Sequence, residues 1–249
     1  MIAVMNQKGG VGKTTTTLNL AHALAMSGKS VTVIDMDPQS HLTASFGAEQ
    51  REQSGIDEVL LGNADLSEVK MKVRDRLHLI PAGSRLGELE QIAVGGAKRG
   101  FLLREALESE KEDEYIFIDC PPSSGMLTMN ALLAAKEMLI PVSGDYLALH
   151  GLSRLLNILK HVEDRLKHVT KKWMVITRFH NRRKLAKEVQ DKLLTYFPDQ
   201  VLATPIRENV ALAESPSFGK TIFEYKKSCH GSVDYLALAE DLAKGRTFK

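Results

Sequence analysis

A chain of 249 residues, 43% of them hydrophobic and 26% charged, has the composition of an ordinary globular protein that can bury a full core. The sequence shows neither an N-terminal signal pattern nor a run of roughly 18 apolar residues, so we expect a cytoplasmic protein that does not span a membrane. The two cysteines, Cys120 and Cys229, lie far apart and outside any C-x-x-C pair, which argues against a disulfide framework and a zinc cluster.

Apolar runs rich in β-branched residues alternate along the chain with longer segments of helical period. The apolar runs predict strands near 1–5, 31–36, 77–80, 115–119, 137–142, 172–177 and 200–204. The helical segments predict helices near 14–27, 54–61, 84–92, 99–110, 124–135, 147–168, 183–196 and 231–244. Strands such as "VTVID" are apolar nearly throughout, as in a sheet that helices cover on both faces. No linker or repeat interrupts the pattern, which predicts an α/β fold with a mostly parallel twisted sheet and a single domain over 1–249.

The stretch "QKGGVGKTTT", residues 7–16, joins the first predicted strand to the first predicted helix. It matches the phosphate-binding pattern G-x-x-x-x-G-K-[ST], except that Gln7 replaces the first glycine and an additional lysine, Lys8, follows it. Backbone N–H groups of such a turn point at phosphate oxygens. We expect Lys13 to contact the β- and γ-phosphates and the Thr14 hydroxyl to bind Mg²⁺. The sequence therefore predicts a nucleoside triphosphate site with Mg²⁺.

Three acids stand at the ends of predicted strands. Asp119 ends "YIFID", where its carboxylate is placed to hold Mg²⁺ through water. Asp35 and Asp37 end "VTVIDMD", and the two-residue period of a strand puts both on one side, so at least one faces the nucleotide. A strand-end aspartate is also a common helix cap or turn former. Three of them beside a phosphate loop favour the functional interpretation.

Four stretches, "KGGVGKTTTTLNLAHAL", "VIDMDPQ", "IDCPPSSGMLTMNALLAA" and "ENVALAESPSFGKTI", together resemble the ParA/MinD family of deviant Walker A ATPases. The resemblance covers nearly the whole chain and is greatest to the small chromosomal ParA (Soj) branch. It implies a P-loop NTPase fold that binds ATP and Mg²⁺ and forms a homodimer when ATP is bound. Lys8 then corresponds to the lysine that reaches the partner subunit's phosphates, and Asp37 to the residue that positions the attacking water. The phosphate cradle corresponds to Gly9, Gly10, Val11, Gly12, Lys13, Thr14 and Thr15.

The resemblance also places an adenine-contacting loop at Arg207 and Asn209. The family often has Ile-Pro-Arg-Asn-Val there, whereas this chain has Ile-Arg-Glu-Asn-Val at 206–210, so Arg207 occupies the proline position and the proline is displaced to Pro205. The loop after Gln39 departs as well, since it has Ser40-His41 in place of Gly-Asn.

The segment from Lys171 to Lys187 carries basic residues and no acidic one. Such a run is compatible with an anionic partner, although a solvated helix face gives the same pattern. The family resemblance favours non-specific double-stranded DNA. The expected contacts are Arg178, Arg182, Arg183, Lys184 and Lys187, with Lys220 and Lys227 after the "SPSFGKTI" element.

The resemblance leaves alternatives for the biological role. The first is segregation of a chromosome or plasmid over the nucleoid, with a ParB-like partner that stimulates hydrolysis. The same cycle also positions protein cargo, such as carboxysomes or chemoreceptor arrays, through an adaptor. A MinD-like membrane cycle needs a C-terminal amphipathic basic helix, whereas Leu236, Ala239, Leu242 and Ala243 indicate an ordinary packed helix face. The nitrogenase iron-protein branch needs two cysteine ligands, and neither cysteine is placed as one. We expect neither a membrane helix nor an N-terminal helix-turn-helix.

Overall fold

The computed structural model describes residues 1–48, 54–91, 97–108, 113–145 and 148–248. Within this part of the chain the strands form one sheet in the order β3-β4-β2-β5-β1-β6-β7. Their bounds are β1 Ile2–Val4, β2 Val31–Asp35, β3 Met71–Arg74, β4 Leu77–Ile80, β5 Tyr115–Asp119, β6 Glu137–Ser143 and β7 Lys171–Thr177. All neighbouring pairs are parallel except β3 with β4. The carboxyl ends of β1, β2 and β5 therefore lie at one end of the sheet, where their loops meet.

The helices alternate with the strands as predicted, with additional short ones. The longer helices are α1 Lys13–Met26, α7 Met126–Ala134, α8 Ala148–Leu166, α9 Lys184–Tyr196 and α12 His230–Lys244. The shorter ones are α2 His41–Ser45, α3 Ile56–Leu61, α4 Leu66–Val69, α5 Leu86–Gln91, α6 Leu102–Leu107, α10 Val210–Glu214 and α11 Ile222–Tyr225, with 3₁₀ turns η1 Ala97–Phe101 and η2 Ser215–Phe218. Residues 92, 109–110 and 147 of the predicted helices lie outside the described part of the chain.

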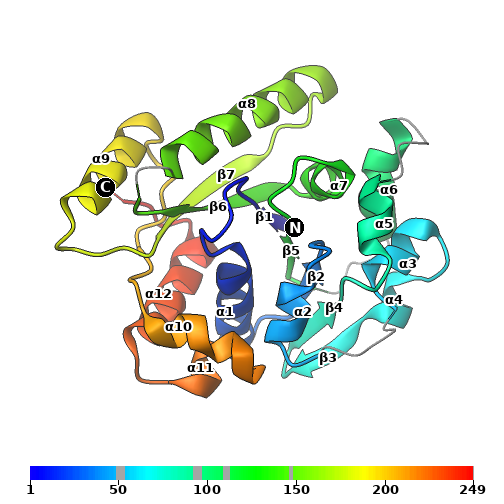
Figure 1. The fold of residues 1–249 in the computed structure, drawn as a ribbon, viewed down its shortest axis with the longest axis horizontal. Coiled ribbons are helices and arrows are strands. Elements are labelled where there is room, and N and C mark those ends of the chain that lie inside the picture. The colour runs from blue at the N-terminus through cyan, green and yellow to red at the C-terminus, as the bar shows by residue number, and fades with distance from the viewer. Residues whose placement is uncertain (49–53, 92–96, 109–112, 146–147, 249) are drawn as a thin grey trace.

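Helices cover both faces of the sheet (Figure 1). Along β1, Ala3 belongs to the core that contains residues of α3 to α9, whereas Ile2 and Val4 belong to the opposite core, which contains residues of α1, α2 and α10 to α12. The two-residue period of a strand thus supplies both cores from one apolar run. Helix α1 is buried along most of its length because it lies between the sheet and α12.

One predicted strand is wrong, and one observed strand was missed. Residues 200–204 form no strand; Val201 makes a single parallel bridge to Met174, and Leu202 makes an antiparallel bridge to Thr247. The regular pairing with β7 stops after Leu202, and the next amide of this segment that bonds β7 is that of Ile206, which donates to the Ile176 carbonyl at 2.8 Å. Strand β3 was not predicted, because its partly exposed "MKVR" residues lack a continuous apolar run. Its antiparallel pairing places a hairpin at the edge of the sheet.

Candidate functional site

The loop between β1 and α1 has the backbone shape of a phosphate cradle. Gly10 and Gly12 have φ values of 73° and 90°, which residues with a Cβ rarely adopt. Gly12 is also the N-cap of α1, so the first free N–H groups of a 14-residue helix point toward the loop. Val11 is buried, and its carbonyl accepts a 2.7 Å hydrogen bond from the Thr177 hydroxyl at the end of β7. The buried hydrogen bond between Thr177 and Val11 therefore anchors the loop to the sheet.

Lys13 is held close to the loop that precedes it. Its side chain is largely buried, and Nζ donates a long 3.4 Å hydrogen bond to the Lys8 carbonyl oxygen. Burial lowers the pKa of the Lys13 ammonium, although the charges of Asp119 and Asp37 act in the opposite direction. An ammonium has three donors, so Nζ retains donors for phosphate oxygens.

Asp119 ends β5 directly behind the first turn of α1. The Thr14 hydroxyl donates to Oδ2 of Asp119 at 2.7 Å, and the Thr17 hydroxyl donates to Oδ1 at 3.1 Å. Burial, and after it the charge of Asp35, raises the pKa of Asp119 to about 7. A cation bound at the Thr14 hydroxyl and this carboxylate would favour the ionised form. The contact of Thr17 was not predicted, although this residue lies three positions after Thr14 and thus on the same helix face.

Asp35 and Asp37 have different roles in the loop that follows β2. Both oxygens of Asp35 are occupied, since they accept hydrogen bonds from the Thr43 amide at 2.8 Å, the Thr43 hydroxyl at 2.7 Å and the Asp37 amide at 3.2 Å. Asp35 is fully buried, and this burial raises its pKa to about 6. One oxygen of Asp37 accepts from the Gln39 amide at 3.0 Å. Of these two acids, Asp37 lines the cavity in front of the phosphate loop.

A cavity of about 600 Å³ opens in front of the phosphate loop. Its lining includes the predicted residues Gly9, Gly10, Gly12, Lys13, Thr14, Thr15 and Asp37, with His41, Ala44 and Ser45 of α2, and Pro122 and Pro216. The predicted phosphate, magnesium and water-positioning residues thus meet in or directly behind one cavity. The wall from α2 and Pro216 was not predicted, because nothing local in these residues indicates their approach to the loop.

A second cavity of about 410 Å³ borders the same loop. The two cavities share Gly10, Gly12 and Thr15, and we name them the phosphate side and the base side after the parts of ATP that each is expected to take. Residues of the base side include Thr177, Ile206, Val210, Leu212 and Tyr235. This partly apolar lining suits a planar base.

Arg207 and Asn209 also line the base side, but both side chains have partners in the protein. The Arg207 guanidinium and its amide donate to Asp234 of α12, with the shortest contact at 2.5 Å. Asn209 caps α10, and its side-chain oxygen accepts from the Ala211 amide at 2.9 Å. An N-cap of this kind contributes about 1 kcal/mol. The structure places these residues beside the base cavity as elements that fix its loop.

Lys8 is absent from the described residues that line the two cavities. Its amide donates to Asn6 Oδ1 at 3.1 Å, and its ammonium pairs with Asp145, which also accepts from the Ser143 hydroxyl at 2.7 Å. The Lys8 side chain is 25% exposed. In the single chain the Lys8 ammonium is therefore paired with Asp145 rather than placed in the lining of the phosphate cavity.

The predicted basic run does not form one surface. Strand β7 separates Lys171 and Lys172 from the basic residues after its carboxyl end. Seven residues of strand at about 3.3 Å each span roughly 20 Å. Lys171 lies over the Trp173 ring, and Lys172 pairs with Glu163 at 2.6 Å. The basic run is therefore continuous in sequence but not in space, and Lys171 and Lys172 lie apart from the residues expected to contact DNA.

The other basic residues of the run gather at the start of α9. Arg182, Lys184 and Lys187 are exposed. Arg183 and Arg178 both approach Glu208, with N···O distances of 3.1 and 3.8 Å. Arg178 and Glu208 also line the base side of the nucleotide cavity, so the basic cluster and the nucleotide site share residues. Exposed Lys220 and Lys227 belong to a separate segment that flanks α11.

Helix α12 packs against the body of the protein with a slightly different face from the predicted one. Ala239 and Leu242 are buried as expected, but Leu236 is 45% exposed and Ala243 is exposed. Tyr235 and Leu238 take their places, because the face toward α1 is rotated by about one residue. No helix in the described ranges is both long and apolar enough to cross a bilayer.

Comparisons with known proteins agree over most of the chain. A family model described as an AAA domain matches residues 1–172. Sporulation initiation inhibitor protein Soj of Bacillus subtilis (strain 168) is 40% identical over 98% of this chain and 98% of its own length. Chromosome partitioning protein ParA of Myxococcus xanthus (strain DK1622) is 40% identical over 100% of this chain and 89% of its own length.

A solved structure shows the same fold in a nucleotide complex. Cobyrinic acid a,c-diamide synthase from Mycobacterium smegmatis, with bound ATP analogue and magnesium, superimposes with a TM-score of 0.84. The match has 29% identity and covers 100% of this chain and 98% of that chain. The full-length sequence matches and the phosphate loop lead to one conclusion: the chain belongs to the ParA/MinD family of P-loop ATPases.

Proposed function

We propose that this protein is a Mg²⁺-dependent ATPase that dimerises with ATP, binds double-stranded DNA without sequence preference, and uses partner-stimulated hydrolysis to segregate or position a cargo over the nucleoid. The partner is a ParB-like protein or a cargo adaptor. The observation that carries the proposal is the two-sided cavity around Gly10, Gly12 and Thr15, with a phosphate side and a base side. Relatives with 40% identity include a chromosome partitioning protein.

The residues present suit ATP and Mg²⁺. In the described part of the chain no group of three or more His, Cys, Asp or Glu side chains is placed to hold a metal alone. Magnesium commonly takes one or two protein oxygens together with substrate phosphates and water. The Thr14 hydroxyl and the Asp119 carboxylate, 2.7 Å apart, supply oxygens of this kind. Bound there, Mg²⁺ would neutralise charge on the phosphate oxygens.

Hydrolysis needs an oriented water and stabilised phosphate charge, more than covalent chemistry from the protein. Asp37 lines the phosphate side, and one of its oxygens keeps the carboxylate fixed through the Gln39 amide. The other oxygen is free to accept from water in our proposal. Asp35 is less suited to this role because the Thr43 and Asp37 groups occupy both of its oxygens.

Dimerisation would bring a second cation to the phosphates. Lys8 is absent from the described lining of its own cavity and is partly exposed, which suits a contact with the nucleotide of a partner subunit. A cation that arrives only in the dimer stabilises charge that develops in the transition state. Nucleotide state and subunit association are coupled in this way.

Binding of ATP and DNA to one preparation tests the proposal. Light scattering should report a dimer with ATP and a monomer with ADP. Fluorescence anisotropy with two unrelated duplexes should give tighter binding with ATP than with ADP and equal affinity for both sequences, with a strong salt dependence. A monomer with ATP, or DNA affinity that ignores the nucleotide, would contradict it.

A further inference from the structure

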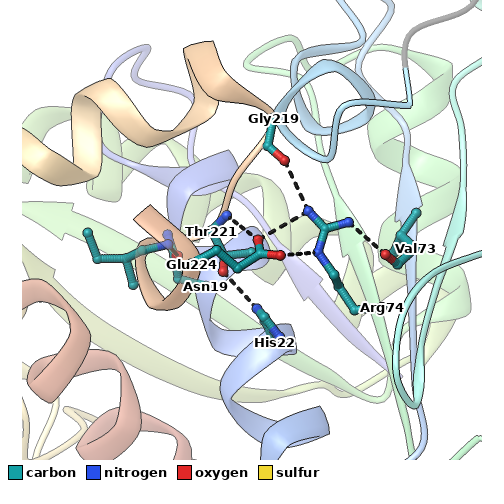
Figure 2. A network of polar contacts seen from close by, with 8 residues as sticks. Asn19, His22, Val73, Arg74, Gly219, Thr221 and Glu224 are labelled. Carbon is teal, nitrogen blue, oxygen red and sulfur yellow. Dashed lines mark hydrogen bonds and ion pairs between the residues drawn. The ribbon is translucent and has the colours of Figure 1, made fainter. Parts of the chain in front are cut away.

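A polar network lies at the edge of the molecule that the β3–β4 hairpin forms (Figure 2). The guanidinium of Arg74, the last residue of β3, uses all three of its nitrogens. Nε donates to Oε1 of Glu224 at 2.5 Å, and Nη2 donates to Oε2 of Glu224 at 3.1 Å and to the Gly219 carbonyl at 3.0 Å. Nη1 donates to the Val73 carbonyl at 2.6 Å. A planar fork with this many partners fixes its position.

The segment that Arg74 holds is itself fixed to α1. Thr221 caps α11, and its amide donates to Oε2 of Glu224 at 2.8 Å. The Thr221 hydroxyl lies 2.7 Å from Nδ1 of His22, and the Ile222 amide donates to Oδ1 of Asn19 at 2.8 Å. His22 and Asn19 belong to the helix that begins at the phosphate loop (Figure 2). Residues 219–224 are therefore anchored to α1.

The other side of Arg74 contacts the end of α2. Its Cζ lies 6.0 Å from the centroid of the Phe46 ring. The next residue, Gly47, approaches Gly219 so closely that a Cβ on Gly219 would lie 2.9 Å from the Gly47 Cα atom. Both glycines have positive φ, 71° and 62°. The backbone after α2 and the backbone after η2 thus lie against each other. Arg74 contacts the Phe46 ring on the α2 side and the Gly219 carbonyl on the η2 side.

These two elements form one wall of the phosphate side. His41, Ala44 and Ser45 come from α2, and Pro216 comes from η2. Helix α2 begins four residues after Asp37, so its placement fixes the loop that carries the proposed water-positioning carboxylate. Arg74 itself is absent from the described lining residues of this cavity. Its influence on the site passes through α2 and η2.

We propose that Arg74 is a positioning residue for ATP hydrolysis, which holds α2 and η2 together so that the Asp37 loop keeps its alignment with the phosphate loop. The inference rests on the proposed ATPase function. The phosphate loop is held independently by β1, α1 and Thr177, so Arg74 affects turnover and leaves nucleotide affinity nearly unchanged. Loss of alignment near a reacting group is costly even when the residue lies far from it.

The test compares Arg74→Met with Arg76→Met, a matched removal of an exposed arginine from the same hairpin. Arg74→Met should lower kcat for phosphate release by roughly 10-fold, with the Kd for a fluorescent ATP analogue within about 2-fold of wild type. Arg76→Met should match wild type in both. Arg74→Lys should behave like Arg74→Met, because an ammonium cannot replace the planar fork.

Hydrogen exchange supplies a readout that does not depend on turnover. In Arg74→Met the amides of 41–47 and 215–219 should exchange faster, with 9–14 unchanged. Glu224→Gln, which keeps the side-chain shape, should give a smaller change in the same segments. If wild type hydrolyses ATP and Arg74→Met hydrolyses it equally fast, the inference is wrong. It is also wrong if Arg74→Met loses nucleotide affinity and its amides lose protection against exchange along the whole chain. A wild type that releases no phosphate instead refutes the proposed function.

Discussion

The Thr14 hydroxyl donates a 2.7 Å hydrogen bond to Asp119, across 105 residues of sequence. This contact joins the first turn after the phosphate loop to the end of β5. Thr17 holds the second oxygen of the same carboxylate, so side chains of α1 fix both oxygens of Asp119. The two threonines thus fix the orientation of the buried carboxylate beside the first turn of α1.

In nucleotide-free protein the contribution of Asp119 to the free energy of unfolding should fall as the pH rises from about 4 to about 7. Burial raises the pKa of Asp119 from 3.8 to about 7, so the folded chain keeps a proton that the unfolded chain has released. The folded state then binds more protons than the unfolded state, and the free energy of unfolding falls with increasing pH through this window. A folded pKa that lies one pH unit above the unfolded pKa corresponds to about 1.4 kcal/mol, so we expect a total effect on the order of a few kcal/mol.

Urea denaturation of wild type and Asp119→Asn at several pH values measures this effect. The variant should lack the Asp119 contribution, so its stability relative to wild type should rise between pH 4 and 7. A constant difference between the two proteins across this range would contradict the assignment.

Lys13→Ala should abolish ATP binding, because the phosphates lose a cation that is preplaced beside the loop. Isothermal titration calorimetry with ATP and Mg²⁺ measures the loss. Lys29→Ala, which removes an exposed lysine paired with Glu114, serves as the control and should bind like wild type. Undiminished affinity in Lys13→Ala would refute the assignment of the loop.

Asp37→Ala should bind ATP and dimerise but hydrolyse ATP at least roughly 100-fold more slowly, since positioned acid-base groups contribute about this much. The phosphate loop does not depend on this carboxylate, so the dimer should persist. Single-turnover phosphate release and light scattering provide the measurements. A variant with normal turnover would move the role elsewhere, although Asp35 has its oxygens occupied by Thr43 and Asp37.

Lys8→Ala should bind ATP as a monomer, because Lys8 is absent from the described lining of its own cavity. Calorimetry should give an affinity close to wild type, and light scattering should show no ATP-dependent dimer. Asp145→Asn is the companion variant. It removes the carboxylate that pairs with Lys8 in the single chain but keeps the lysine, so it separates loss of the Lys8–Asp145 ion pair from loss of Lys8 itself. A Lys8→Ala dimer as abundant as wild type would show that the lysine does not act across subunits.

Reversal of Arg182 and Arg183 to Glu should weaken DNA binding about equally for unrelated duplexes. The salt slope should become shallower by about one unit for each lost phosphate contact, while ATP turnover without DNA stays near wild type. Lys72→Glu with Arg76→Glu makes the same change of net charge on the β3–β4 hairpin, at the opposite edge of the sheet from β7. This control should retain binding. If the Arg182 and Arg183 variant binds DNA as tightly as wild type, these two arginines belong to a solvent-exposed helix face that does not contact DNA.

Glu208→Gln should change DNA binding in the opposite direction. It removes the carboxylate that Arg183 approaches at 3.1 Å and Arg178 at 3.8 Å. Exposed ion pairs contribute about 0–1 kcal/mol each, so we expect a gain in affinity of a few fold, measured by anisotropy over the same salt series. Unchanged affinity would show that the two arginines do not contact DNA.

Residues adjacent in the sequence determined the form of the phosphate loop and of the elements around it. The loop from Gly9 to Thr15 is contiguous, and its glycines, lysine and threonines act through local backbone geometry, so its form follows from the residues themselves. The strands and longer helices were also predictable, because burial on both faces of the sheet requires continuous apolar runs and helical periodicity. Asp119 was placed correctly beside Thr14, since parallel strands bring their carboxyl ends to one end of the sheet.

Only the tertiary structure decided which distant residues meet. Arg74 and Glu224 are 150 residues apart, and no local pattern predicts that they would join α2 to η2. The basic run reads as continuous from Lys171 to Lys187, yet β7 carries its two parts to opposite ends of the sheet. Arg207 occupies a position beside the base cavity, but Asp234 on α12 determines where its guanidinium lies. Short-range backbone geometry and periodicity follow from neighbouring residues, whereas contacts between distant side chains depend on how the packed elements are placed.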